Sequence, residues 1–159
     1  MKAQMDAPQP VVFIYVEGTP YPMKASDSQS ELKKGWDIQG INVGRKIVRY
    51  FWNAHAGQLA DSQPRFAIYP KKQLLSDYAL IRLKEKKTHR QMPAAAFDDC
   101  DYMRVDLHSF HIENLPDMGF AVSPLRPLAP GEYILVDLSQ TPVNEYGDIR
   151  AYDFRVIKE

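Results

Sequence analysis

Residues 127–138 read PLAPGEYILVDL, and this stretch decides more about the fold than any other part of the chain. The pair Pro130-Gly131 is a strong turn signal. It is followed at once by a run of aromatic and β-branched residues, which favours a strand that begins near Tyr133. A second run of this kind, residues 151–156, comes shortly afterwards. The two runs predict a closing β-hairpin at the C-terminus.

Short runs of the same character recur through the rest of the chain, several of them alternating apolar and polar residues. The predicted strands cover residues 11–16, 36–43, 46–52, 65–69, 78–84, 86–92, 101–108 and 120–122, besides the two of the closing hairpin. Residues 24–35 are polar and predict a long loop. About nine or ten short strands, with turns every ~8–12 residues and no sustained helical period, indicate an all-β, antiparallel sandwich or barrel.

Length and charge narrow the class of protein. The 159 residues fit a tail over 1–10 and one domain over 11–159. Lys and Arg together number 20, as do Asp and Glu, so the net charge is zero and argues against a nucleic-acid partner. No run is long enough for a membrane span. The single cysteine, Cys100, leaves the redox compartment open, and no motif predicts a cofactor.

One group of side chains offers ligands for a metal ion. Asp106, His108, His111 and Glu113 lie within eight positions of each other. Asp106 and His108 would share one face of a strand, and a bend near Ser109 would bring the other two to them. The spacing matches no established zinc motif. The alternative interpretation is a row of polar residues that face solvent.

Two further sets of residues are candidates for ligand binding. Tyr50 and Trp52 flank Phe51, and because neighbours on a strand point to opposite faces, at least one of the three is expected on the outside. An exposed pair would suit stacking on a sugar, and core packing is the alternative. Lys86, Lys87 and Arg90 form the densest basic patch. That patch would suit an anionic ligand, or it marks an edge hairpin whose lysines discourage aggregation.

The closing hairpin resembles that of immunoglobulin-like β-sandwich domains in exported bacterial proteins of unknown function. The residues that carry the resemblance are Leu128, Pro130, Gly131, Tyr133, Tyr152 and Phe154, with an upstream block of Gly57, Ala60, Pro64, Phe66, Leu80, Arg82, Leu83, Lys87 and Arg90. The resemblance implies an immunoglobulin-like antiparallel β-sandwich and an extracytoplasmic location, periplasmic or secreted. It also implies a buried Tyr133 whose hydroxyl bonds to the backbone near Leu128 or Ala129. It carries over no catalytic residue.

The leading hypothesis is therefore a non-catalytic protein- or glycan-binding module of an exported bacterial protein. The alternative is a metal-binding protein or a metal-dependent hydrolase that uses the Asp106, His108, His111 and Glu113 group. A third hypothesis is an assembly subunit that associates through a sheet edge.

Overall fold

A computed structural model describes residues 11–33, 36–39, 41–43, 46–70, 74–93, 102–140 and 150–157. These residues form seventeen strands and three short 3-10 helices, so the chain is all-β as the sequence predicts. The strands pair antiparallel, with one parallel exception between β8 and β17. The expected tail over residues 1–10 and Cys100 both lie outside the described residues.

The strands form three larger sheets and one isolated hairpin. The first sheet runs in the order β14 (Phe110–Leu115), β15 (Gly119–Pro124), β9 (Phe66–Ile68), β1 (Val12–Val16) and β2 (Thr19–Pro22). The second runs β13 (Tyr102–Arg104), β10 (Tyr78–Arg82), β16 (Gly131–Asp137), β17 (Arg150–Val156) and β3 (Ser26–Asp27), with β8 (Leu59–Ala60) beside β17. The third is β11 (Lys84–Glu85), β12 (His89–Pro93), β7 (Lys46–Trp52) and β4 (Gln29–Lys33).

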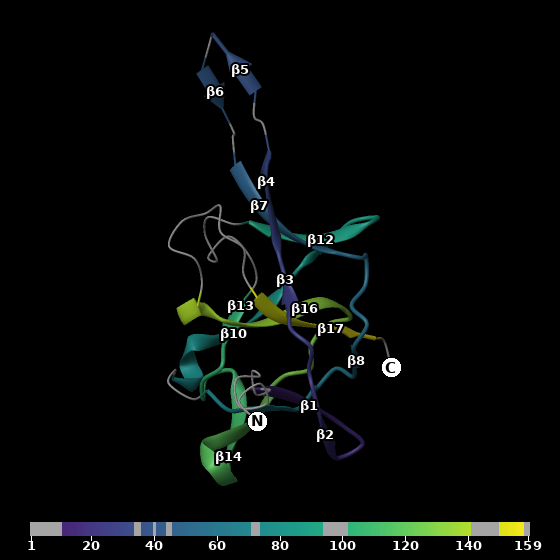
Figure 1. The fold of residues 1–159 in the computed structure, drawn as a ribbon, viewed down its shortest axis with the longest axis vertical. Coiled ribbons are helices and arrows are strands. Elements are labelled where there is room, and N and C mark those ends of the chain that lie inside the picture. Colours follow the sequence, from purple (N-terminus) through teal and green to yellow (C-terminus); the bar gives the residue numbers. More distant parts are fainter. Residues whose placement is uncertain are drawn as a thin grey trace, which may run out of the picture.

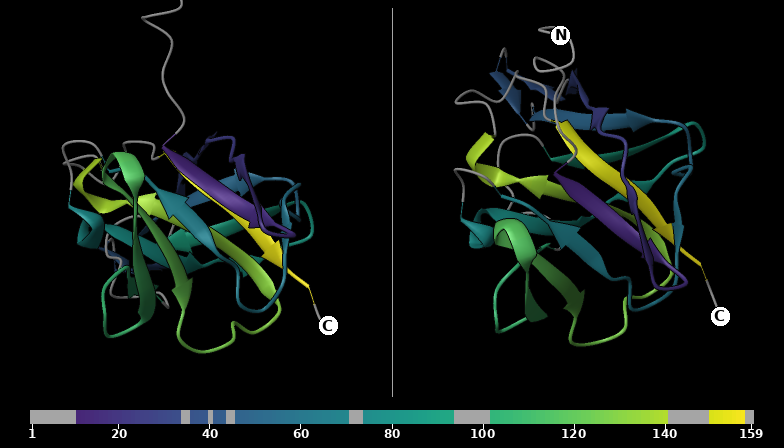
Figure 2. Two further views of the ribbon diagram at one scale, coloured as in Figure 1. Left: turned by 90° about the horizontal axis from the view of Figure 1, so that it is seen from below. Right: turned by 60° about the horizontal axis from the view of Figure 1, so that its bottom comes forward.

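The remaining pair, β5 (Trp36–Ile38) and β6 (Ile41–Val43), lies at the tip of a long extension formed by β4 and β7 (Figure 1). The 3-10 helices are η1 (Leu75–Asp77), η3 (Pro116–Met118) and η4 (Leu138–Gln140). In both views of Figure 2 the first strand, β1, lies close to the last, β17. Among the described residues no helix is long and apolar enough to cross a membrane.

The second sheet buries side chains on both of its faces, and β16 shows this most clearly. Tyr133 and Leu135 join a hydrophobic cluster that also takes in Val12 and Phe66 from the first sheet. Ile134 and Val136 point the other way, into a second cluster. Because both faces are covered, β16 is a nearly continuous apolar run and shows no alternation of apolar with polar residues. The third sheet contributes Phe51 and Met92 to that second cluster.

The closing hairpin forms as predicted. β16 and β17 pair antiparallel from Gly131–Val156 to Val136–Ala151. The Tyr133 hydroxyl donates a hydrogen bond of 2.7 Å to the carbonyl oxygen of Ala129, which confirms the expected bond to the upstream backbone. The Tyr133 ring also stacks on Phe154, with the ring centroids 5.6 Å apart. Residues close in sequence thus fix the start of β16.

Two predictions for residues 24–43 are wrong. Residues 24–35 contain strands β3 and β4 where a loop was expected. β4 pairs with the well-predicted strand β7, so backbone pairing overrides the polar composition. Residues 36–43 form two paired strands in place of a single one. The chain turns between them at Gln39, whose φ of 51° is a turn conformation.

The strand predicted over residues 101–108 is also too long. β13 ends at Arg104, and the chain then turns, with the N–H groups of Ser109 and Phe110 both donating to the carbonyl oxygen of Asp106. Val105 is buried, whereas Leu107, predicted to share its face, is 77% exposed. Alternation of apolar and polar residues alone could not reveal this turn, because a turn can carry the same pattern.

Candidate functional site

The centre of the candidate site is a buried ion pair between Arg90 on β12 and Glu132 on β16. The exposed fraction of the side chain is 2% for Arg90 and zero for Glu132, and Arg90 Nη1 lies 3.3 Å from Glu132 Oε1. Arg90 Nη1 also donates to Asp153 Oδ2 at 2.9 Å. Arg155 Nε lies 3.5 Å from Glu132 Oε2, on the side away from Arg90. Removing two charges from water costs several kcal/mol per ion, so each needs close partners of opposite sign.

The ion pair also fixes the loop that follows β7. Arg90 donates to the carbonyl oxygens of Trp52 and Asn53, each at 3.0 Å. Glu132 accepts the backbone N–H of Ala56 at 2.7 Å. Asn53 has a φ of 72°, an uncommon left-handed conformation that these bonds help to hold. The loop after Trp52 is therefore anchored to the interior of the protein.

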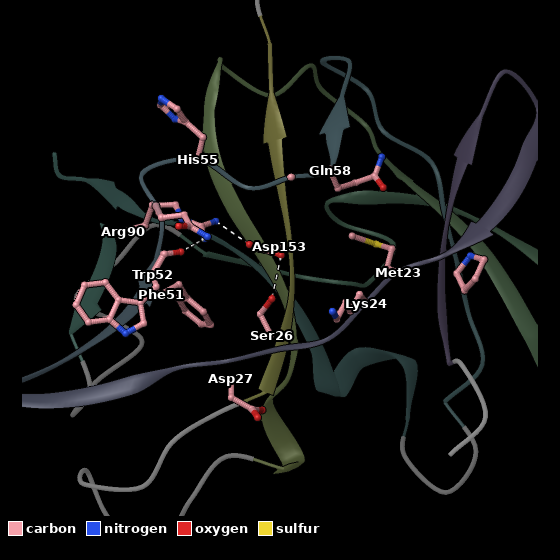
Figure 3. A pocket seen from close by; sticks show the side chains of 13 residues that line it. Met23, Lys24, Ser26, Asp27, Phe51, Trp52, His55, Gln58, Arg90 and Asp153 are labelled. Atoms are coloured by element: carbon pink, nitrogen blue, oxygen red, sulfur yellow. Dashed lines mark hydrogen bonds and ion pairs between the residues drawn. The ribbon is translucent and has the colours of Figure 1, made fainter. Parts of the chain in front are cut away.

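Beside this loop lies a pocket of about 680 Å³, shown in Figure 3. Its lining residues come from the β2–β3 segment, from the end of β7 with the loop after it, and from β12 and β17. They are Pro22, Met23, Lys24, Ser26, Asp27, Phe51, Trp52, Asn53, His55, Gly57, Gln58, Arg90 and Asp153. Ser26 donates to Asp153 Oδ1 at 3.3 Å, next to the bond from Arg90. The lining thus combines an apolar part with many groups that donate or accept hydrogen bonds.

Among the lining residues Trp52 has the largest exposed side chain, with 54% of its surface open to solvent, and its indole points away from Met23, Lys24 and Ser26 in Figure 3. Its ring makes edge-to-face contacts with Tyr50, at 5.1 Å between centroids, and with His89, at 6.4 Å. His89 lies directly opposite Trp52 in the β7–β12 pairing. Phe51 points to the other face and is buried, so the three consecutive aromatic residues divide between the faces as expected. The two neighbouring rings hold the indole in place.

The residues predicted for ligand binding fall into two places. Trp52 lines the pocket, and Tyr50 supports it from the side. Arg90 also lines the pocket, but it is buried and paired, which differs from the exposed basic patch that the sequence suggests. Lys86 and Lys87 are exposed in the turn between β11 and β12, outside the lining. Lys86 and Lys87 lie in a turn, whereas Arg90 belongs to β12. Because successive side chains of a strand point to opposite faces, Arg90 points into the protein.

The predicted metal-ligand group is only partly brought together. His111 Nε2 lies 3.0 Å from Glu113 Oε1 on the exposed face of β14. The hydrogen bond from His111, and then the charge of Arg65, lower the pKa of the Glu113 carboxyl. Asp106 instead accepts the backbone N–H of His108 within the turn. Among the described residues, three or more potential ligands converge at a different place, around His55, Glu85 and Glu132.

Several residues of the site could not be found from the sequence. Glu132 sits beside the conspicuous Tyr133, and Asp153 lies within the last strand, yet their partners are 42 and 63 positions away. Ser26 and Lys24 fall in the segment predicted to be a loop. A buried charge inside an apolar run, as at Glu132, is the one signal that sequence inspection offers.

Comparisons with known proteins add no function to this geometry. No protein-family model matches the chain, and no curated protein and no solved structure is significantly similar to it. The site must therefore be interpreted from its own chemistry.

Proposed function

We propose that the protein is a non-catalytic glycan-binding module whose pocket beside Trp52 takes a sugar unit of a neutral oligosaccharide. The observation that carries this proposal is an exposed indole, supported by two neighbouring rings, on a residue that also lines a pocket rich in polar groups. One face of a pyranose ring is apolar and suits stacking on an aromatic ring, while its hydroxyl groups need donors and acceptors around them. An oligosaccharide that enters the pocket and extends to the indole of Trp52 would meet both requirements.

The charges of the lining favour a neutral ligand. Arg90 and Asp153 neutralise each other at 2.9 Å, and the lining adds one more charge of each sign, Lys24 and Asp27. An anionic or cationic ligand would therefore find no surplus of opposite charge. Polar atoms of Ser26 and Asn53 also belong to the lining and suit hydroxyl groups.

Anchoring of the loop supports binding without large rearrangement. The carbonyl oxygens of Trp52 and Asn53 accept hydrogen bonds from Arg90, and Arg90 is paired with Glu132 and Asp153. A site that is already ordered loses less conformational entropy when the ligand arrives. Sugars bind proteins weakly, so a small entropic cost of ordering the site preserves more of their affinity.

The test is a glycan array followed by calorimetric titration of the best glycan against Trp52→Ala. We expect Trp52→Ala to weaken binding about tenfold or more, since stacking contributes up to ~1.5 kcal/mol beyond buried area. The matched control is Tyr21→Ala. Tyr21 is 51% exposed, much like Trp52, but lies outside the pocket lining. Its replacement should change the affinity less than about twofold.

Two results would contradict this proposal. One is an array without any signal, accompanied by capture of a protein partner in a pull-down. The other is hydrolytic turnover of a bound glycan, which would make the protein an enzyme. Circular dichroism of each variant shows whether it is folded before its affinity is compared.

The fold and setting belong to the same proposal. An immunoglobulin-like β-sandwich is supported by the bond from Tyr133 to Ala129 and by one apolar cluster shared between two sheets. The resemblance of the closing hairpin to exported bacterial domains supports a periplasmic or secreted location. Glycans exposed to such a compartment would then be the natural ligands.

A further inference from the structure

A second site is formed by His55, Glu85 and Glu132, and we propose that it binds a divalent zinc ion. One ligand atom from each residue lies within 4.8 Å of the other two. His55 Nδ1 is 3.3 Å from Glu132 Oε2 and 3.9 Å from Glu85 Oε1. Neighbouring ligands of a tetrahedral zinc ion with bonds of ~2.1 Å lie roughly 3.4 Å apart. The present spacing is therefore close to that of a zinc site.

The three side chains differ in how far they can move, and this difference would let them adjust their positions around a zinc ion. Glu132 is fully buried, and its Oε1 is held by Ala56 and Arg90, while Oε2, the proposed ligand atom, lies 3.5 Å from Arg155 Nε. His55 and Glu85 are about half exposed, at 50% and 45%, and come from a loop and from the short strand β11. A fixed ligand and two adjustable ones can reach the remaining distance through changes in side-chain torsion alone. Water would complete the coordination on the exposed side.

The charges around the site also favour a cation. Glu132 and Asp153 share the guanidinium groups of Arg90 and Arg155, which leaves these four side chains neutral together. Glu85 then adds one negative charge to the group. A bound cation would compensate that charge and replace the weak contact between His55 and Glu85.

The mixed ligand set selects the kind of metal. An imidazole nitrogen with two carboxylates suits zinc, whereas calcium and magnesium prefer oxygen ligands alone. Because His55 lines the sugar pocket and Glu85 does not, the ion would sit at its margin. The zinc proposal does not rest on the proposed glycan binding, although His55 belongs to both sites, and it is tested without any sugar.

The experiment is calorimetric titration of the full chain with zinc chloride in a buffer that does not chelate metals. We expect one equivalent to bind and magnesium chloride to give no comparable signal. His55→Ala and Glu85→Gln should each weaken zinc binding at least about 100-fold, since even loss of a residue that only supports a ligand costs 10–100-fold. Both side chains are exposed, so these variants should fold. A zinc-dependent rise in melting temperature, lost in both variants, is the second readout.

Matched controls separate this site from the other possibilities. His111→Ala removes an exposed histidine that also pairs with a glutamate, and Cys100→Ser removes the only thiol. Both variants should bind zinc as the unchanged protein does. Absence of saturable binding would overturn the proposal. So would full binding by His55→Ala, or loss of binding in either control.

Discussion

Tyr133 and Glu132 are neighbours on β16, yet they illustrate two different ways in which this protein uses a buried polar side chain. Tyr133 faces the first sheet, and its hydroxyl bonds to a carbonyl only four residues upstream. Glu132 faces the opposite side and has four partners, of which the nearest in sequence is Arg155, on the adjacent strand. A partner close in sequence fixes the Tyr133 face of the strand, whereas partners far away in sequence fix the Glu132 face.

The comparison shows which face of β16 positions the candidate site. The Tyr133 face contains mainly hydrophobic packing, and the bond from Tyr133 to Ala129 secures the start of a strand. The Glu132 face holds charges that anchor the end of β7, which carries Trp52, and the loop after it, which carries His55. The cost of burying those charges is offset by their mutual pairing and by the backbone bonds they make. The same network thereby positions both proposed binding sites.

The largest expected effect is on the Glu132 face. Glu132→Gln leaves Arg90 buried with too little negative charge, so the free energy of unfolding should fall by about 3–5 kcal/mol. Urea denaturation followed by circular dichroism measures this change. The matched control is Glu113→Gln, in an ion pair that is exposed at both ends. An equal loss of stability in the two variants would remove the distinction between buried and exposed pairs.

A substitution on the Tyr133 face is expected to lower the free energy of unfolding by a smaller amount. Tyr133→Phe keeps the stacked ring but leaves the Ala129 carbonyl without its donor, which should cost roughly 1–2 kcal/mol of unfolding free energy. The same denaturation experiment applies, with Tyr21→Phe on the surface as the control. If Tyr133→Phe were as stable as the unchanged protein, the hydroxyl would play no part in holding the hairpin.

A third prediction concerns how the free energy of unfolding depends on alkaline pH, through a tyrosine on the Tyr133 face. Burial, and then the charge of Asp137, raise the pKa of Tyr78 above its ordinary value. Because the Tyr78 hydroxyl keeps its proton more strongly in the folded state, ionisation above about pH 10 favours the unfolded state. The free energy of unfolding is therefore unaffected by ionisation of Tyr78 below about pH 10 and falls as the pH rises further. Tyr78→Phe should therefore reduce the fall in unfolding free energy by about 1.4 kcal/mol per pH unit above pH 10. An unchanged slope in this variant would contradict the assignment.

The two faces also differ in how far the sequence could predict them. The bond from Tyr133 was expected from the resemblance of the closing hairpin, whose Pro-Gly turn, tyrosine and hydrophobic run lie within one short stretch. The all-β class followed from many such runs. The partners of Glu132 were not predictable, because sheet order brings Arg90 and Asp153 together across the molecule. Asp106 and His108 were expected on one strand with a bend after them, whereas both lie within the turn itself.

The central claim is that the anchored end of β7 presents Trp52 to a sugar, and fluorescence tests it most directly. The chain has two tryptophans, so in Trp36→Phe all tryptophan emission comes from Trp52. Titration of this variant with the glycan that gives the strongest array signal should change the emission saturably, with the dissociation constant found by calorimetry. A glycan that binds in the calorimeter while the emission of Trp52 stays constant would contradict the account.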